Sequence, residues 1–201
     1  MLKKLFQNAR KPQGLAGRMM VSSMNTGHIP LAKWAFQFIQ FREDMQVLDI
    51  GCGGGANITH MLTRWPGGRV DGVDYSADSV AVSRKKNQGA LGKNCEIIQG
   101  DVTALPYGEA EYDLITAFET VYFWPDLTET FKKIRTILKD RGNFVIACEM
   151  ADPSNTVWSN MIDGMTVYSG EQLEDHLLKA GFTSVKAEST NKHWVCLVAS
   201  K

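Results

Sequence analysis

The sequence predicts an α/β fold, a doubly wound, mostly parallel sheet with helices on both faces. From residue 45 onward strand-like and helix-like stretches alternate, and a glycine-rich turn follows the first strand. The 201 residues, 44% of them hydrophobic, are of ordinary size for one domain. We therefore expect residues 1–201 to form a single domain.

The strands are predicted from short apolar runs, most of them between turn residues. The first five lie at 45–50, 69–74, 95–99, 112–118 and 142–150, and two more lie near 183–188 and 193–199. The helices between them are predicted from apolar spacing and caps. Ser76 is a candidate N-cap, and Ser169 and Gln172 fit a capping box that opens a helix through Lys179, with Gly181 as its C-cap. The apolar stripes are Ile58, Met61, Leu62 and Trp65, and later Leu127, Phe131, Ile134 and Leu138.

Two segments lie outside this alternation. Residues 1–44, with a helix expected near 29–41, are predicted to form an N-terminal cap. Residues 151–169 are too long for an ordinary strand-to-helix loop, and we expect a substrate-side excursion there. Its large apolar side chains fit a substrate wall and a core equally well; they are Trp158, Met161, Met165 and Tyr168.

Charge and cysteine usage limit the possible functions. The net charge is zero, but residues 1–42 hold seven basic and no acidic residues. Such an arm can face an anionic substrate, a nucleic acid or a membrane surface, or lie solvated on an acidic body. The four cysteines form no metal-binding spacing, and we expect a reduced, cytoplasmic chain without a membrane span. No cluster of ligands suggests a metal.

The stretch VLDIGCGGGAN, residues 47–57, resembles a nucleotide-binding loop. Gly51, Gly53 and Ala56 satisfy G-x-G-x-x-A, so a nicotinamide or flavin dinucleotide has to be considered. Asp74 ends the next strand, where an acid can bind a ribose diol. A dinucleotide and S-adenosylmethionine both carry such a ribose, so Asp74 does not separate them.

Two further acids favour S-adenosylmethionine. Asp49 lies two residues before Gly51, where it would repel a pyrophosphate but attract an ammonium or a sulfonium. Asp101 can accept a hydrogen bond from an adenine amine, and the amide of Val102 can face a ring nitrogen. Tyr75 can lie along the adenine face.

As a set, five motifs resemble those of class I S-adenosylmethionine-dependent methyltransferases: VLDIGCGGGAN, VDGVDYS, GDVTALP, YDLITAFETVYFWPD and LKDRGNFVI. The resemblance covers residues 45–150 closely. It implies a Rossmann-like sheet of seven strands with the last one antiparallel, and S-adenosylhomocysteine as product. It implies cofactor contacts from Asp49, Gly51 and Gly53 to the methionine end, from Asp74 to the ribose and from Asp101 and Val102 to the adenine. Cys52 occupies a variable position of the loop, where its backbone can line the cofactor.

The segment 117–125, AFETVYFWP, faces the transferred methyl in that family. It lacks both the Asn/Asp-Pro-Pro-aromatic motif and the Pro-Cys pair of many nucleic-acid enzymes. We therefore expect a small-molecule acceptor and consider nucleic acid unlikely, with a monomer or homodimer as the assembly. An RNA or protein methyltransferase, a dinucleotide-dependent oxidoreductase and a non-catalytic binding module remain alternatives.

Three residues are candidates for catalysis. Glu119 can accept a proton from an attacking hydroxyl or amine, or else anchor the N-terminal segment. Tyr122 can orient the acceptor. His28 can act as a base or merely cap a helix.

Two residues complete the candidate cofactor site. Phe118 is expected to lie beside the cofactor as part of the wall. The segment KPQGLAGRMMVSSMNTGH also resembles the opening of some small bacterial relatives, and it would place Arg18 near the methionine carboxylate. A surface ion pair is the other interpretation of Arg18.

Overall fold

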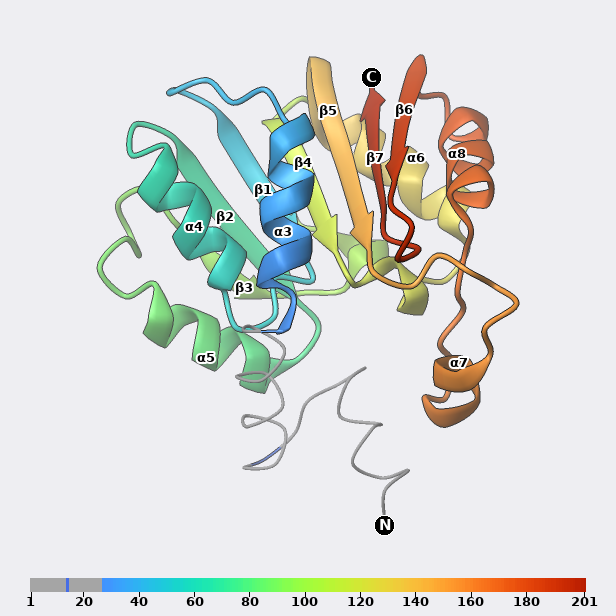
Figure 1. Cartoon of the computed structure of the whole chain (residues 1–201). Helices are drawn as coiled ribbons and strands as arrows, with labels where there is room; N and C mark the ends of the chain where they lie inside the picture. The colour runs from blue at the N-terminus through green and yellow to red at the C-terminus, as the bar shows by residue number, and fades with distance from the viewer. Residues whose placement is uncertain (1–13, 15–26) are drawn as a thin grey trace.

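The computed structural model describes Gly14 and residues 27–201. Within these residues a single sheet of seven strands forms the centre, as predicted, in the order β3-β2-β1-β4-β5-β7-β6 (Figure 1). The strands β1 to β5 are parallel, and β7 pairs antiparallel with both β5 and β6. The bounds are β1 Gln46–Ile50, β2 Arg69–Asp74, β3 Ile97–Gln99, β4 Tyr112–Phe118, β5 Leu138–Cys148, β6 Ser184–Ser189 and β7 Val195–Ser200.

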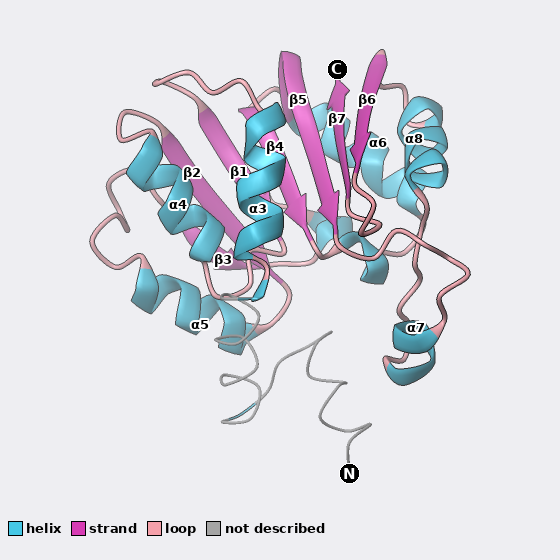
Figure 2. Ribbon diagram, viewed as in Figure 1, coloured by secondary structure: helices cyan, strands magenta, loops and turns pink. Residues whose placement is uncertain are grey.

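Helices cover both faces of this sheet (Figure 2). Successive strand residues point to opposite faces. Val47 of β1 packs in one apolar cluster with Leu31 of α3 and Ile58 of α4, whereas Leu48 packs in a second cluster with Phe131 of α6. The helices are α3 Ile29–Ala35, α4 Ala56–Arg64, α5 Ala77–Lys86, α6 Leu127–Ile137, α7 Val157–Met161 and α8 Gly170–Lys179, with short 3-10 turns η2 Phe36–Phe38, η3 Val102–Ala104 and η4 Val121–Phe123.

The strand order places the site. The chain moves outward from β1 through β2 to β3, then crosses back so that β4 pairs with the other side of β1. In parallel sheets a crevice opens outside the carboxyl ends of the strands where the order reverses. The loops that follow β1, β2, β3 and β4 all begin at this edge.

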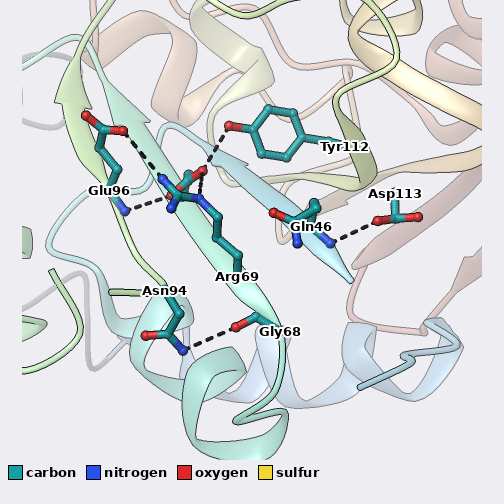
Figure 3. Close-up of polar contacts among 8 residues, drawn as sticks. Gln46, Gly68, Arg69, Asn94, Glu96, Tyr112 and Asp113 are labelled. Atoms are coloured by element: carbon teal, nitrogen blue, oxygen red, sulfur yellow. Dashed lines mark hydrogen bonds and ion pairs between the residues drawn. The ribbon is translucent and has the colours of Figure 1, made fainter. Parts of the chain in front are cut away.

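A polar network joins β2 to its neighbours at the opposite, amino-terminal edge (Figure 3). The Asp71 carboxylate, which is buried, accepts hydrogen bonds from Tyr112 Oη at 3.0 Å, Arg69 Nε at 2.8 Å and the backbone N of Glu96 at 2.7 Å. Both of its oxygens are occupied in this way. Asp71 is therefore a structural acid, remote from the crevice.

Both predicted N-terminal caps are present, whereas the predicted C-cap, Gly181, lies one residue beyond the C-cap position. The Ser76 hydroxyl accepts from the backbone N of Ser79, and Ser169 and Gln172 form the reciprocal capping box. Gly181 has φ 92 and follows Ala180, which holds the C-cap position itself.

The N-terminal helix differs from the prediction of 29–41. It ends at Ala35, continues as a 3-10 turn, and Ile39 is extended. The ring of Phe36 stacks on His60 at 4.9 Å and lies 5.3 Å from Phe118, so aromatic packing overrides the helical spacing. The helix covers a face of the sheet, and it reaches the ligand edge only at its first end.

Smaller differences concern strand ends. The third strand begins at Ile97, since Cys95 makes only an isolated bridge to Leu91. The fifth begins earlier than predicted, at Leu138, which pairs with Tyr112 beside a register shift. None of the helices in residues 27–201 has the length and apolar character needed to cross a bilayer.

Candidate functional site

The backbone of the glycine loop between β1 and α4 is tied to β2. Gly51 N and Cys52 N both donate to Val73 O, at 2.8 and 3.1 Å, and Gly53 N donates to the Asp74 carboxylate at 2.8 Å. A loop that binds pyrophosphate directs such amides at the phosphate oxygens. Here these three amides already have partners within the protein.

Gly51 and Gly53 of this loop differ in what surrounds them. Gly51 has φ 72, and a Cβ there would lie 2.3 Å from Thr120 Oγ1. Gly53 has φ 52, and a Cβ there would meet nothing within 4 Å. The loop therefore packs closely against the segment after β4 at Gly51 and presents bare backbone to an open cavity at Gly53.

Asp74 stands at the end of β2, on the wall of this cavity. Its two oxygens accept from Gly53 N and Ser76 N, each at 2.8 Å. Burial raises the pKa of Asp74, and these two hydrogen bonds oppose the shift. The carboxylate is thus fixed in one orientation, with lone pairs left for a ligand hydroxyl.

Asp49 lies beneath the loop and does not line the cavity. It is 2% exposed, and Thr116 Oγ1 donates to its Oδ1 at 2.7 Å. Burial raises the pKa of Asp49 to about 7; the Thr116 hydrogen bond opposes the shift and the charge of Asp74 adds to it. Asp49 can therefore act on a ligand only through the electrostatic effect of its charge, across the loop.

The residues predicted to hold an adenine lie where β2 and β3 end. Asp101, Val102 and Tyr75 all line it. Thr103 donates to Asp101 Oδ1 from its backbone N at 2.8 Å and from its hydroxyl at 2.7 Å, and these bonds lower the pKa of Asp101. The acid is therefore ionised at neutral pH, and its second oxygen can accept from an amine.

The cavity has a volume of about 710 Å³ and an acidic lining. Among the described residues that line it, Asp74, Asp101 and Glu119 are acidic and none is Lys or Arg. His28 also lines it. The electrostatic potential inside therefore favours a cationic ligand and disfavours an anionic one.

His28, Glu119 and Glu149 converge at one end of the cavity. His28 Nδ1 lies 3.5 Å from Glu149 Oε2 and 3.9 Å from Glu119 Oε2. Burial lowers the pKa of His28, but the two glutamates together raise it by more than burial lowers it. The net shift of the pKa is therefore upward. Two carboxylates, those of Glu119 and Glu149, thus lie beside one imidazole, that of His28.

Glu119 is held rigidly within this cluster. Its Oε1 accepts from Tyr122 Oη at 2.9 Å and from the backbone N of Glu149. Burial raises its pKa to about 7, with the charge of His28 opposing the shift. The residue has φ 57, a left-handed conformation that L-residues other than Asn and Asp seldom adopt.

The structure brings most of the predicted site together. Every described residue proposed for the cofactor lines the cavity, except Asp49. Tyr122 is buried and does not line it, and its hydroxyl donates to Glu119. Arg18 lies outside the described residues. The lining members are Gly51, Cys52, Gly53, Asp74, Tyr75, Asp101, Val102 and Phe118.

Sequence reasoning missed Glu149 and assigned the 151–169 excursion only broadly. Glu149 directly follows β5, as Glu119 directly follows β4, and these strands are parallel neighbours. That shared position was a usable signal. From the excursion only Gly164 lines the cavity, while Met165 is buried in the core.

Comparison with known proteins identifies similar chains. Residues 47–142 match the model of a methyltransferase domain family. A demethylmenaquinone methyltransferase of Lactococcus lactis is 28% identical over 121 residues, which are 59% of this chain and 47% of that protein. A sterol 4-C-methyltransferase of Caenorhabditis elegans is 23% identical over 137 residues, 67% of this chain and 39% of that one. This chain thus matches about half or less of the length of these two relatives.

The fold has close solved counterparts. The crystal structure of a SAM-dependent methyltransferase from Aquifex aeolicus has a TM-score of 0.75 to this chain at 18% identity. The match covers 91% of this chain and 97% of that one. At this identity the likeness shows the shared fold.

Proposed function

We propose that this chain, which belongs to the class I S-adenosylmethionine-dependent methyltransferases, transfers a methyl group to a small organic acceptor held beside Glu119. The charge of the cavity carries the proposal. Three carboxylates and no Lys or Arg face it among the described lining residues. The sulfonium and ammonium of S-adenosylmethionine are attracted by that charge, and a dinucleotide pyrophosphate is repelled.

The residues present fit this cofactor. The volume of about 710 Å³ lies within the range of small-molecule sites. Bare backbone at Gly53 allows close approach to the loop, Asp74 can accept from the ribose hydroxyls, and Asp101 with Val102 can pair with an adenine edge. When bound, the cofactor supplies an electrophilic methyl group on a good leaving group.

The protein must then align an acceptor and exclude water. Phe118, Phe123 and Trp124 line the cavity next to Glu119 and offer an apolar wall. Because Oε1 of Glu119 takes both hydrogen bonds from the protein, Oε2 remains available for interactions at the acceptor end of the cavity. Positioning of this kind can supply about 7–11 kcal/mol of the barrier reduction in favourable cases.

The acceptor class follows from the same charge. A cavity lined by carboxylates disfavours the phosphates of a nucleic acid, and the relatives described above are named for a demethylmenaquinone and a sterol. We therefore propose a small, uncharged or cationic acceptor. An RNA or protein acceptor is the alternative that experiment must separate.

Calorimetric titration with S-adenosylmethionine and NAD tests the cofactor. The parent should bind only the former, and Asp74→Asn should weaken binding about 10-fold or more, the usual effect of losing a charged hydrogen-bond acceptor. Asp71→Asn is the matched control, because Asp71 lies on the same strand at the opposite edge. Binding of NAD, or equal affinity in Asp74→Asn, would contradict the assignment.

Methyl transfer is tested separately with methyl-labelled cofactor and a cell extract divided into small molecules, RNA and protein. Label should appear in the small-molecule fraction. Label in RNA or protein would overturn the acceptor class. Tight cofactor binding without transfer to any fraction would favour a binding module.

A further inference from the structure

We propose that His28, Glu119 and Glu149 bind a divalent metal ion at the acceptor end of the cavity. One ligand atom from each residue lies within 4.8 Å of the other two. His28 Nδ1 is 3.5 Å from Glu149 Oε2 and 3.9 Å from Glu119 Oε2. Two atoms bound to one Zn²⁺ at about 2.1 Å are roughly 3.0–3.4 Å apart, so a small rotation of the imidazole suffices.

The three atoms have no competing partners in the described part of the chain. His28 Nδ1 is buried without a hydrogen bond. On Glu119, Tyr122 and the Glu149 amide both occupy Oε1, which leaves Oε2 directed toward the imidazole. No Lys or Arg of the described residues forms an ion pair with either glutamate. Two neighbouring carboxylates, one of them 8% exposed, are costly without a cation, and a divalent ion would neutralise them.

The fold supports a preformed site. Glu119 and Glu149 directly follow β4 and β5, whose last residues are held in register by the pairing of Phe118 with Ala147. His28 directly precedes α3, which packs on the same sheet. Ligands placed at the ends of rigid elements keep their geometry better than ligands within long loops.

The donor set indicates the type of ion and its use. One imidazole and two carboxylates suit Mn²⁺, Zn²⁺ or a similar divalent ion, and three protein ligands leave positions open for other oxygens. His28 and Glu119 line the cavity, so those positions face the acceptor. This inference rests on the proposed function. It assigns the acceptor to molecules with two adjacent oxygens that chelate the ion, such as a vicinal diol or a hydroxyketone.

Titration of the chelator-treated full chain with Mn²⁺, followed by electron paramagnetic resonance, tests the site. We expect one ion per chain. Glu149→Gln and Glu119→Gln should each weaken binding about 10-fold or more. Asp101→Asn, which alters a carboxylate at the other end of the same cavity, should leave it unchanged.

Thermal unfolding of the same samples guards against misfolded variants, because a bound ion raises the melting temperature of the parent but not of the two glutamine variants. In the parent, an imidazole nitrogen coupling should disappear in His28→Ala. Absence of binding at millimolar Mn²⁺, or binding that the variants leave unchanged, would overturn the proposal and leave a protonated His28 as the partner of the glutamates. Cofactor titration on the same protein shows separately whether the proposed function fails.

Discussion

Replacing Asp49 by Asn should stabilise the protein near pH 8 and weaken cofactor binding. The carboxylate is 2% exposed, and no Lys or Arg of the described residues forms an ion pair with it. Burial raises its pKa to about 7. Asn has nearly the same shape and can accept the same hydrogen bond from Thr116, so the substitution removes charge and little else.

The magnitude follows from the pKa difference. Asp has a pKa of 3.8 before burial and about 7 in the folded protein. Between these values the folded protein keeps a proton that the unfolded chain has lost, so the stability of the parent falls as the pH rises through this window. Roughly three units correspond to about 4 kcal/mol at most. The Asn variant has no such loss, so its advantage should grow from near zero around pH 4 to this value above pH 7.

Urea unfolding near pH 4.5 and near pH 8 measures the difference. Asp71→Asn is a control of opposite sign, because it takes a charged acceptor from Arg69 and should destabilise the protein at both pH values. An Asp49→Asn variant less stable than the parent near pH 8, or a difference independent of pH, would refute the reasoning. In the same variant the affinity for S-adenosylmethionine should fall about 10-fold, because an attractive charge is lost.

Two further substitutions test the loop and the opposite edge. Gly51→Ala should lower the free energy of unfolding by about 1–3 kcal/mol, since φ is 72 and the new Cβ would meet Thr120. Unfolding in urea measures this difference, and an unchanged midpoint would contradict the close approach of Gly51 to Thr120. Tyr112→Phe should lower the free energy of unfolding by about 1.5–3 kcal/mol, because it removes a donor to Asp71. Calorimetric titration should find the affinity for the cofactor unchanged. A large change in affinity would mean that the two edges of the sheet are coupled.

The side of the cavity formed by the glycine loop and Asp74 could be predicted because its signals are local in sequence. Asp74 follows a strand, and the glycine loop follows another, so each residue is placed by the element beside it. Parallel pairing of β1 with β2 then brings the two strand ends together. Strand periodicity and the glycine spacing were therefore sufficient.

The side of the cavity at His28 and Glu149 was harder to predict because it depends on distant segments. Glu149 was included in a strand predicted at 142–150, but the strand ends at Cys148, which turns the glutamate into an edge residue. His28 reaches the same place because α3 packs on the sheet through Leu31. No spacing within the sequence encodes that contact.

Tyr122 shows a further limit of sequence reasoning. The pattern indicated a polar group near the acceptor, and the tyrosine is indeed three residues from Glu119. Only the 3-10 turn Val121–Phe123 decides that its hydroxyl points back to the glutamate and accepts from the Met150 amide. Short turns of this kind carry little periodic signal.

The left-handed backbone of Glu119, with φ 57, sets stability against activity at one position. For an L-residue this conformation costs roughly 1–2 kcal/mol, and glycine would adopt it with almost no steric penalty. Glycine would also remove the acceptor of the Tyr122 hydroxyl and the Glu149 amide. A library selected only for folding should therefore favour asparagine, which adopts this conformation more readily than glutamate and keeps an acceptor oxygen, whereas selection for methyl transfer should retain glutamate. Positions at which the two selections diverge in this way would outline the acceptor site without knowledge of the acceptor.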